Sequence, residues 1–178
     1  KKWKEAASLQ VQPANFSWND FPWQEAIIHF TRLLGAAHTG KLDSAKSELK
    51  QLNQLNATLQ KEKDWYKSKE IEIQIKTGEA WIQFESTNKE SALYNMRLAA
   101  NMEDSIDKHP VTPGEVLPAR ELLGDMLLQL KQNEEALNAY ETVLTKSPNR
   151  FNSLYNAGIA SEKLGNNQKK IFYFKQLL

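Results

Sequence analysis

The chain has 178 residues, a formal net charge of +1, and 40% hydrophobic and 25% charged residues, the mixture expected of a folded protein with a buried core. Lys and Arg are interspersed with Asp and Glu, which argues against the basic patch of a nucleic-acid-binding protein. The absence of Cys excludes disulfides and thiolate chemistry, and no apolar run reaches the length of a membrane span.

Scarce Gly and Pro, seven and six residues, predict an all-α fold of long helices. The opening KKWKEAASL predicts the end of a helix, and an amphipathic run follows from Trp23 to His38. Two longer helical patterns span Leu42–Gln60 and Glu62–Phe84, and STNKESALYNMRLAA predicts another helix. VQPANFSWNDFP and HPVTPGEVLP have the composition of loops.

The clearest helical pattern is ARELLGDMLLQLKQNEEALNAYETVLTKSPNR, in which two amphipathic stretches flank the polar break KQNEE. It predicts an antiparallel helix hairpin that ends before Pro148. The next segment repeats this pattern 34 residues later, with Gly158 in the place of Gly124 and Phe174 in the place of Tyr140. A period of 34 predicts a helical repeat.

These residues resemble the tetratricopeptide repeat family, whose pattern is met by Leu123, Gly124, Leu127, Ala136, Tyr140 and Pro148. The resemblance implies antiparallel helix hairpins stacked as a right-handed α-solenoid. It also implies that the small residues lie where the two helices of a hairpin touch, and that the aromatic residue fills the gap toward the next repeat. HFTRLLGAA together with KHPVTPGEVLPARELLGDMLL is further similar to a group of bacterial tetratricopeptide proteins of undefined function.

The small residue of each second helix gives the register of the repeats, with marks at Ala6, Ala45, Ala92 and Ala136. We expect a single array over residues 1–178, and a fragment of a longer one because a repeat needs its neighbours and the chain starts at Lys1. The expected segments are 1–20 (end of a preceding repeat and a loop), 21–60, 61–108, an insertion loop at 109–116, 117–150, and a partial repeat at 151–178.

The family lines its concave surface chiefly with the first helix of each hairpin, and the resemblance carries such positions onto this chain. The candidate binding residues are Phe30, Leu34, His38, Trp81, Phe84, Glu121, Asp125, Gln129, Tyr155 and Ile159. Thr77, Glu85, Leu128 and Glu162 belong to the same mapping. A groove of this kind would be aromatic on one side and acidic on the other, which suits a peptide with apolar anchors and a basic residue. The family's Lys/Asn/Arg clamp for a peptide carboxylate is absent.

Few residues suggest other chemistry. His29 and His38 are nine apart, on opposite sides of a helix, so we expect one partly buried and the other exposed near a helix end rather than a shared metal. Glu103, Asp104, Asp107 and His109, with Glu115 or Glu121, could form an oxygen-rich cation site, although a hydrated acidic helix end is the stronger interpretation. The five tryptophans are dispersed in sequence and are expected to pack between helices rather than form a cage.

No phosphate loop, zinc motif or nucleophile elbow occurs, so the sequence predicts no enzyme, no cofactor and no metal. The leading hypothesis is a protein or peptide interaction scaffold. The alternative is a regulatory repeat domain that senses a ligand or cation, with self-association through the terminal repeats as a third possibility. The sequence leaves the cellular compartment undetermined.

Overall fold

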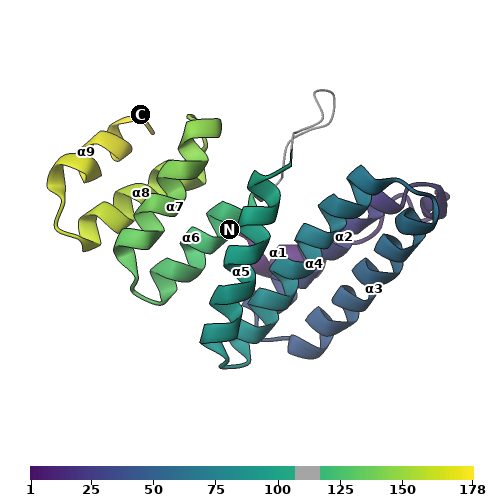
Figure 1. The fold of residues 1–178 in the computed structure, drawn as a ribbon. Coiled ribbons are helices and arrows are strands. Elements are labelled where there is room, and N and C mark those ends of the chain that lie inside the picture. The colour runs from purple at the N-terminus through teal and green to yellow at the C-terminus, as the bar shows by residue number, and fades with distance from the viewer. Residues whose placement is uncertain (107–116) are drawn as a thin grey trace. The chain divides into compact units, whose positions relative to one another are not determined.

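The structure is a computed structural model that describes residues 1–106 and 117–178, and every regular element in those residues is helical (Figure 1). The predicted all-α fold of stacked hairpins is confirmed. The α-helices are α1 (Trp3–Ala7), α2 (Pro22–His38), α3 (Leu42–Lys61), α4 (Trp65–Glu85), α5 (Lys89–Asp104), α6 (Ala119–Gln129), α7 (Asn133–Lys146), α8 (Phe151–Lys163) and α9 (Asn167–Lys175). A short 3-10 turn at Trp18–Asp20 precedes α2.

Local sequence explains where the helices stop and start. Two residues after the last residue of α3 and of α6 stands a lysine with left-handed backbone, Lys63 and Lys131. After each lysine, the next backbone N–H donates to the carbonyl five residues earlier, at 3.0 Å for Asp64 and 2.9 Å for Gln132. Asp64 then begins the following helix, because its carboxylate accepts from the Lys67 N–H at 3.2 Å.

The described chain divides into two compact units, residues 1–99 and 100–178. In unit 1, α2 contacts α1, α3 and α4, and α3 also contacts α4. These three long helices run side by side (Figure 1). α1 lies so close to α2 that a Cβ on Gly35 would be 2.7 Å from the Trp3 carbonyl oxygen. Glycine at this position therefore permits a backbone-to-backbone contact.

α4 is buried on more than one side, and its sequence has an alternation of apolar and polar residues that is unusual for a helix. Ile71, Ile73 and Ile75 alternate with polar residues, a spacing of two that places successive isoleucines about 200° apart around a helix. All three are buried, with 0, 4 and 6% of their surface exposed. The long helical pattern predicted here is confirmed, and the alternation reflects neighbours on both sides rather than a strand.

In unit 2, α6 contacts α7 and α8, and α8 contacts α7 and α9. A Cβ on Gly124 would lie 2.6 Å from the Tyr140 ring, and a Cβ on Gly158 would lie 2.8 Å from a δ-carbon of Phe174. Each aromatic ring thus covers the glycine of its own hairpin. The expectation that the aromatic residue fills the gap toward the next repeat stays a prediction.

The small-residue marks Ala45, Ala92 and Ala136 are fully buried. The helix pairs α2–α3, α4–α5, α6–α7 and α8–α9 follow one another along the chain. The single array and its boundaries stay a prediction, and the expected insertion loop at 109–116 lies outside the described residues.

Candidate functional site

The residues predicted to line a groove in unit 1 pack between helices instead. The exposed fractions are 9, 1, 0 and 4% for Phe30, Leu34, Trp81 and Phe84. α2 and α4 meet directly, since a Cβ on Gly78 would lie 2.6 Å from a δ-carbon of Leu33. The prediction is corrected here: these four side chains are core residues of unit 1, because they lie where the helices are in contact and not on an open surface.

His38 is the fifth predicted residue of unit 1, and it lies between two indoles. Its ring stacks on Trp3 at 4.0 Å and 11°, and its centroid is 4.1 Å from that of Trp81. Burial first, and then the positive charges of Lys1 and of the N-terminal amino group, lower the pKa of His38 from 6.5 to about 4. The convergence of two tryptophans here was missed, because residues 3 and 81 are far apart in the sequence.

His29 is also buried, so neither histidine is exposed and that expectation is wrong. Its Nδ1 lies 2.6 Å from Glu48 Oε2, and Arg32 donates to the other oxygen of Glu48 at 2.6 Å. Glu25 lies 3.6 Å from His29 Nε2. This cluster of polar contacts joins α2 to α3.

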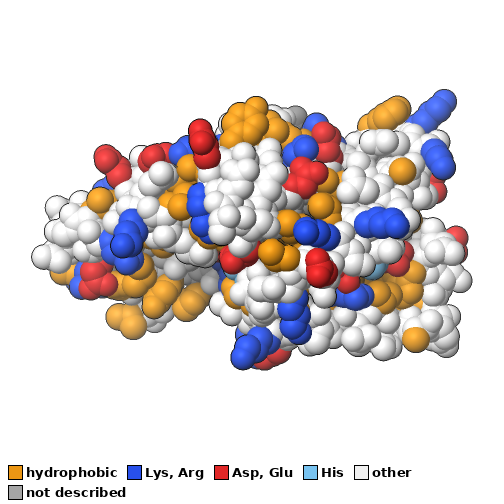
Figure 2. Space-filling view, turned by 90° about the horizontal axis from the view of Figure 1, so that it is seen from below, with side chains coloured by type: hydrophobic (Ala, Val, Ile, Leu, Met, Phe, Trp, Pro, Cys, Tyr) orange, Lys and Arg blue, Asp and Glu red, His pale blue; other side chains and the backbone are white. Residues whose placement is uncertain are grey.

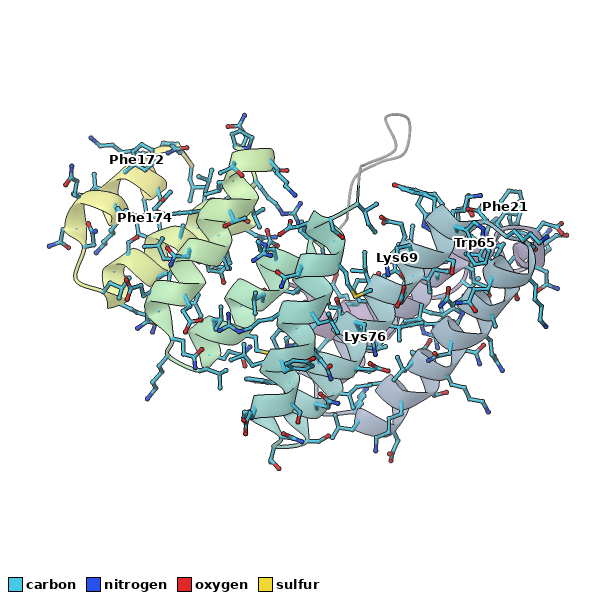
Figure 3. All side chains as sticks on the ribbon, viewed as in Figure 1. Phe21, Trp65, Lys69, Lys76, Phe172 and Phe174 are labelled. Carbon is cyan, nitrogen blue, oxygen red and sulfur yellow. The ribbon has the colours of Figure 1, made fainter. Side chains whose placement is uncertain are left out.

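The solvent-facing side of α4 carries a charged stripe that the sequence mapping missed. Lys69 pairs with Glu72 at 2.8 Å, and Lys76 pairs with Glu79 at 2.9 Å. Trp65 begins the stripe and exposes 67% of its surface (Figure 3). The sequence does contain a pattern that indicates this stripe: Lys and Glu stand three residues apart, a spacing typical of the hydrated side of a helix.

In unit 2, Glu121 is fully buried and already paired. Arg150 Nε donates to its Oε2 at 2.5 Å, and the Ser153 hydroxyl donates to the same oxygen at 2.8 Å. The predicted role of Glu121 as an acidic surface residue is corrected, because its charge is used to join α6 to the start of α8. The predicted acidic side of the groove therefore loses Glu121.

Asp125 forms a second junction between the same helices. Tyr140 donates to its Oδ1 at 2.8 Å, and Asn156 Nδ2 donates to the same atom at 3.0 Å. Burial and the neighbouring Asp125 raise the pKa of Tyr140 well above its usual range, so the phenol stays protonated and keeps donating. These hydrogen bonds thereby hold α6, α7 and α8 against one another.

The remaining predicted residues of unit 2 reach the surface. Gln129 is exposed, Ile159 is half-buried, and Tyr155 exposes 47% of its surface. Tyr155 has two aromatic neighbours: Phe151 lies parallel to it at 6.3 Å between ring centroids, and Phe174 lies 6.0 Å away. Figure 2 shows apolar side chains gathered at the end of the molecule that α8 and α9 occupy.

The acidic end of α5 is occupied by helix-to-helix contacts. Glu103 accepts from the Ala119 backbone N–H at 2.8 Å, and Asp104 pairs with Arg120 and with Lys146. Asp107, His109 and Glu115 lie outside the described residues. Within residues 1–106 and 117–178, no cluster of three potential metal ligands occurs.

Residues 124–165 match a protein family described as TPR repeat. No curated protein sequence matches the chain. Among the described helices, none combines the length and the apolar character that crossing a membrane requires.

Proposed function

Residues 124–165 belong to the tetratricopeptide repeat family. From this premise we propose that the chain is a protein-interaction scaffold whose α6–α8 face contacts a protein partner. We define the α6–α8 face by the surface-reaching residues Gln129, Tyr155 and Ile159. Scaffolding is the general role of such repeats, and we assign no chemistry to the chain itself.

One observation carries the assignment to this face: polar contacts fix α6 against α8, while Gln129 and Tyr155 stay exposed and Ile159 half-buried. Glu121 and Asp125 are each held by two donors, from Arg150 and Ser153 and from Tyr140 and Asn156. A surface fixed in this way loses little conformational entropy when it binds, which favours recognition by stacked helices. In unit 1, the residues predicted to line the groove are buried between helices instead.

The test places a photo-reactive amino acid at position 129 or 159 and, as a matched control, at Asn138 on the exposed side of α7. In an extract of the source cells, we expect one protein to be cross-linked from 129 and 159 and not from 138. Gln129→Lys should reduce its capture severalfold, because a buried interface position then carries an unpaired charge. Cross-linking that is equal from all three positions would contradict the assignment to this face.

A further inference from the structure

α3 is held in unit 1 through a narrow buried side that includes few large apolar residues. The buried residues of α3 are Ala45, Glu48, Leu52, Asn56 and Leu59, and the helix packs against both α2 and α4 (Figure 1). Two of the five are polar, although a helix ordinarily turns an apolar stripe toward its neighbours because burial of apolar surface drives packing. The two polar residues therefore serve something other than apolar burial.

Each of the two polar side chains binds a different neighbouring helix. Glu48 exposes 7% of its surface and contacts α2, where one carboxylate oxygen lies 2.6 Å from His29 Nδ1 and the other accepts from Arg32 at 2.6 Å. Asn56 exposes 9% and contacts α4, where its Oδ1 accepts from the Ser68 hydroxyl at 2.7 Å. α3 thus has a buried polar contact with each of these two helices.

These two contacts lie on opposite edges of the buried side. At about 3.6 residues per turn, Glu48 points about 40° to one side of Leu52 and Asn56 points about 40° to the other side. The two residues are also about 12 Å apart along the helix axis, because each residue advances a helix by about 1.5 Å. A rotation of α3 about its axis in either direction would therefore move at least one of the two side chains away from its partner.

The apolar residues of α3 do not prevent such a rotation by themselves. Leu49 and Leu55 are half-buried, and they lie about 60° to either side of Leu52. A rotation of that size brings one of these leucines toward the buried side while Leu52 moves to its edge, so the buried apolar area changes little. The hydrophobic effect therefore favours a range of rotations of α3 rather than one.

We propose that Glu48 and Asn56 form a two-sided lock, the α3 lock, which fixes the rotation of α3 about its own axis between α2 and α4. A rotated α3 would leave buried His29 or buried Ser68 without this partner, and an unpaired buried polar group disfavours that arrangement. The inference goes beyond the proposed function, because it concerns unit 1 and does not depend on the α6–α8 face.

The test measures the rotation of α3 in the full chain with two spin labels. The chain has no Cys, so Gln24→Cys on α2 and Gln54→Cys on α3, both at exposed positions, give two unique labelling sites. A rotation of about 60° moves a side chain on the helix surface by about 5 Å, the radius of a helix with its side chains. Electron paramagnetic resonance on the double-labelled chain should show one narrow distance between the labels.

Two pairs of substitutions replace the α3 lock by apolar groups. The first pair is His29→Leu with Glu48→Leu, and the second is Asn56→Leu with Ser68→Ala. Arg32 needs no replacement, because 31% of its side chain is exposed and its guanidinium can reach solvent. Either pair alone should keep the single distance, since the other contact still holds α3.

The two pairs together should add a second distance between the labels, which differs from the first by up to about 5 Å. Circular dichroism and the urea midpoint should still show a stable helical chain, because apolar replacement of a complete buried polar contact is often neutral or stabilising.

Asn53→Leu is the matched control, because it adds a leucine to α3 outside the lock. Asn53 is exposed and donates to the Leu49 carbonyl of its own helix at 2.8 Å, so the labels should keep the parent distance. A single narrow distance in the chain with all four substitutions would overturn the inference. So would a second distance in the control, or loss of helical circular dichroism in the chain with four substitutions, which would show that the contacts are needed for folding rather than for rotation.

Discussion

At the scale of single residues, the main lesson comes from Glu121. Its position in the repeat pattern suggests a charged groove residue, yet it is fully buried and bound by Arg150 and Ser153. A sequence pattern places a residue on one side of a helix, but whether a carboxylate meets solvent or an arginine depends on a partner 29 residues away. That pairing has no local signal in the sequence, which is why the burial of Glu121 could not be predicted.

His38 gives a prediction about pH. Its pKa is lowered from 6.5 to about 4 in the folded chain, so between these values the unfolded chain binds a proton that the folded chain does not. The stability from neutral His38 is therefore complete above about pH 6.5 and is lost as the pH falls toward 4, amounting to about 3 kcal/mol at most. We expect His38→Phe, which keeps a ring between the indoles, to show a shallower loss of stability over this range in urea titrations. Equal slopes for the two proteins would contradict the effect.

At the scale of helices, the existence of each helix and its approximate bounds could be predicted from the periodicity of apolar residues and from helix caps, because both are local properties of the sequence. The long patterns at Leu42–Gln60 and Glu62–Phe84 correspond to α3 and α4 within a few residues. It was harder to predict which side of a helix packs against other helices. α4 has a buried side and a charged stripe that both contain polar residues, and the choice between them depends on α2, which is distant in sequence.

The contact between α6 and α7 yields a matched pair of substitutions. Gly124→Ala places a methyl against the Tyr140 ring, which is fully buried and fastened to Asp125. We expect the free energy of unfolding to fall by about 1–2 kcal/mol, because overpacking outweighs the helix propensity gained.

Gly158→Ala is the companion, since it meets Phe174, which is half-buried and carries no hydroxyl to hold it. The ring can swing outward, so the loss should be smaller than at position 124 or absent. Urea unfolding of both variants measures the difference. A larger loss at position 158 would show that Phe174 is held more firmly than its exposure indicates.

At the scale of the whole molecule, the two compact units differ in their spectroscopic probes. All five tryptophans lie in residues 1–99, so indole fluorescence reports unit 1, whereas circular dichroism reports the helices of both units. We expect Glu121→Gln to destabilise unit 2 by about 2–3 kcal/mol, because it breaks a buried ion pair whose arginine is partly solvated. The circular dichroism transition should then begin at lower urea while the fluorescence transition stays in place. If both transitions move together, the chain unfolds as one cooperative unit.

The contacts at the end of α5 have a practical consequence for engineering. Glu103 holds the first N–H of α6, and Asp104 holds Arg120 and Lys146, so α5 and α6 are fastened to each other without relying on the chain that connects them. Lengthening that connection costs only the slowly growing entropy of closing a longer loop. The contact between the end of α5 and the start of α6 is thus expected to persist when residues are inserted in the chain between Ile106 and Leu117.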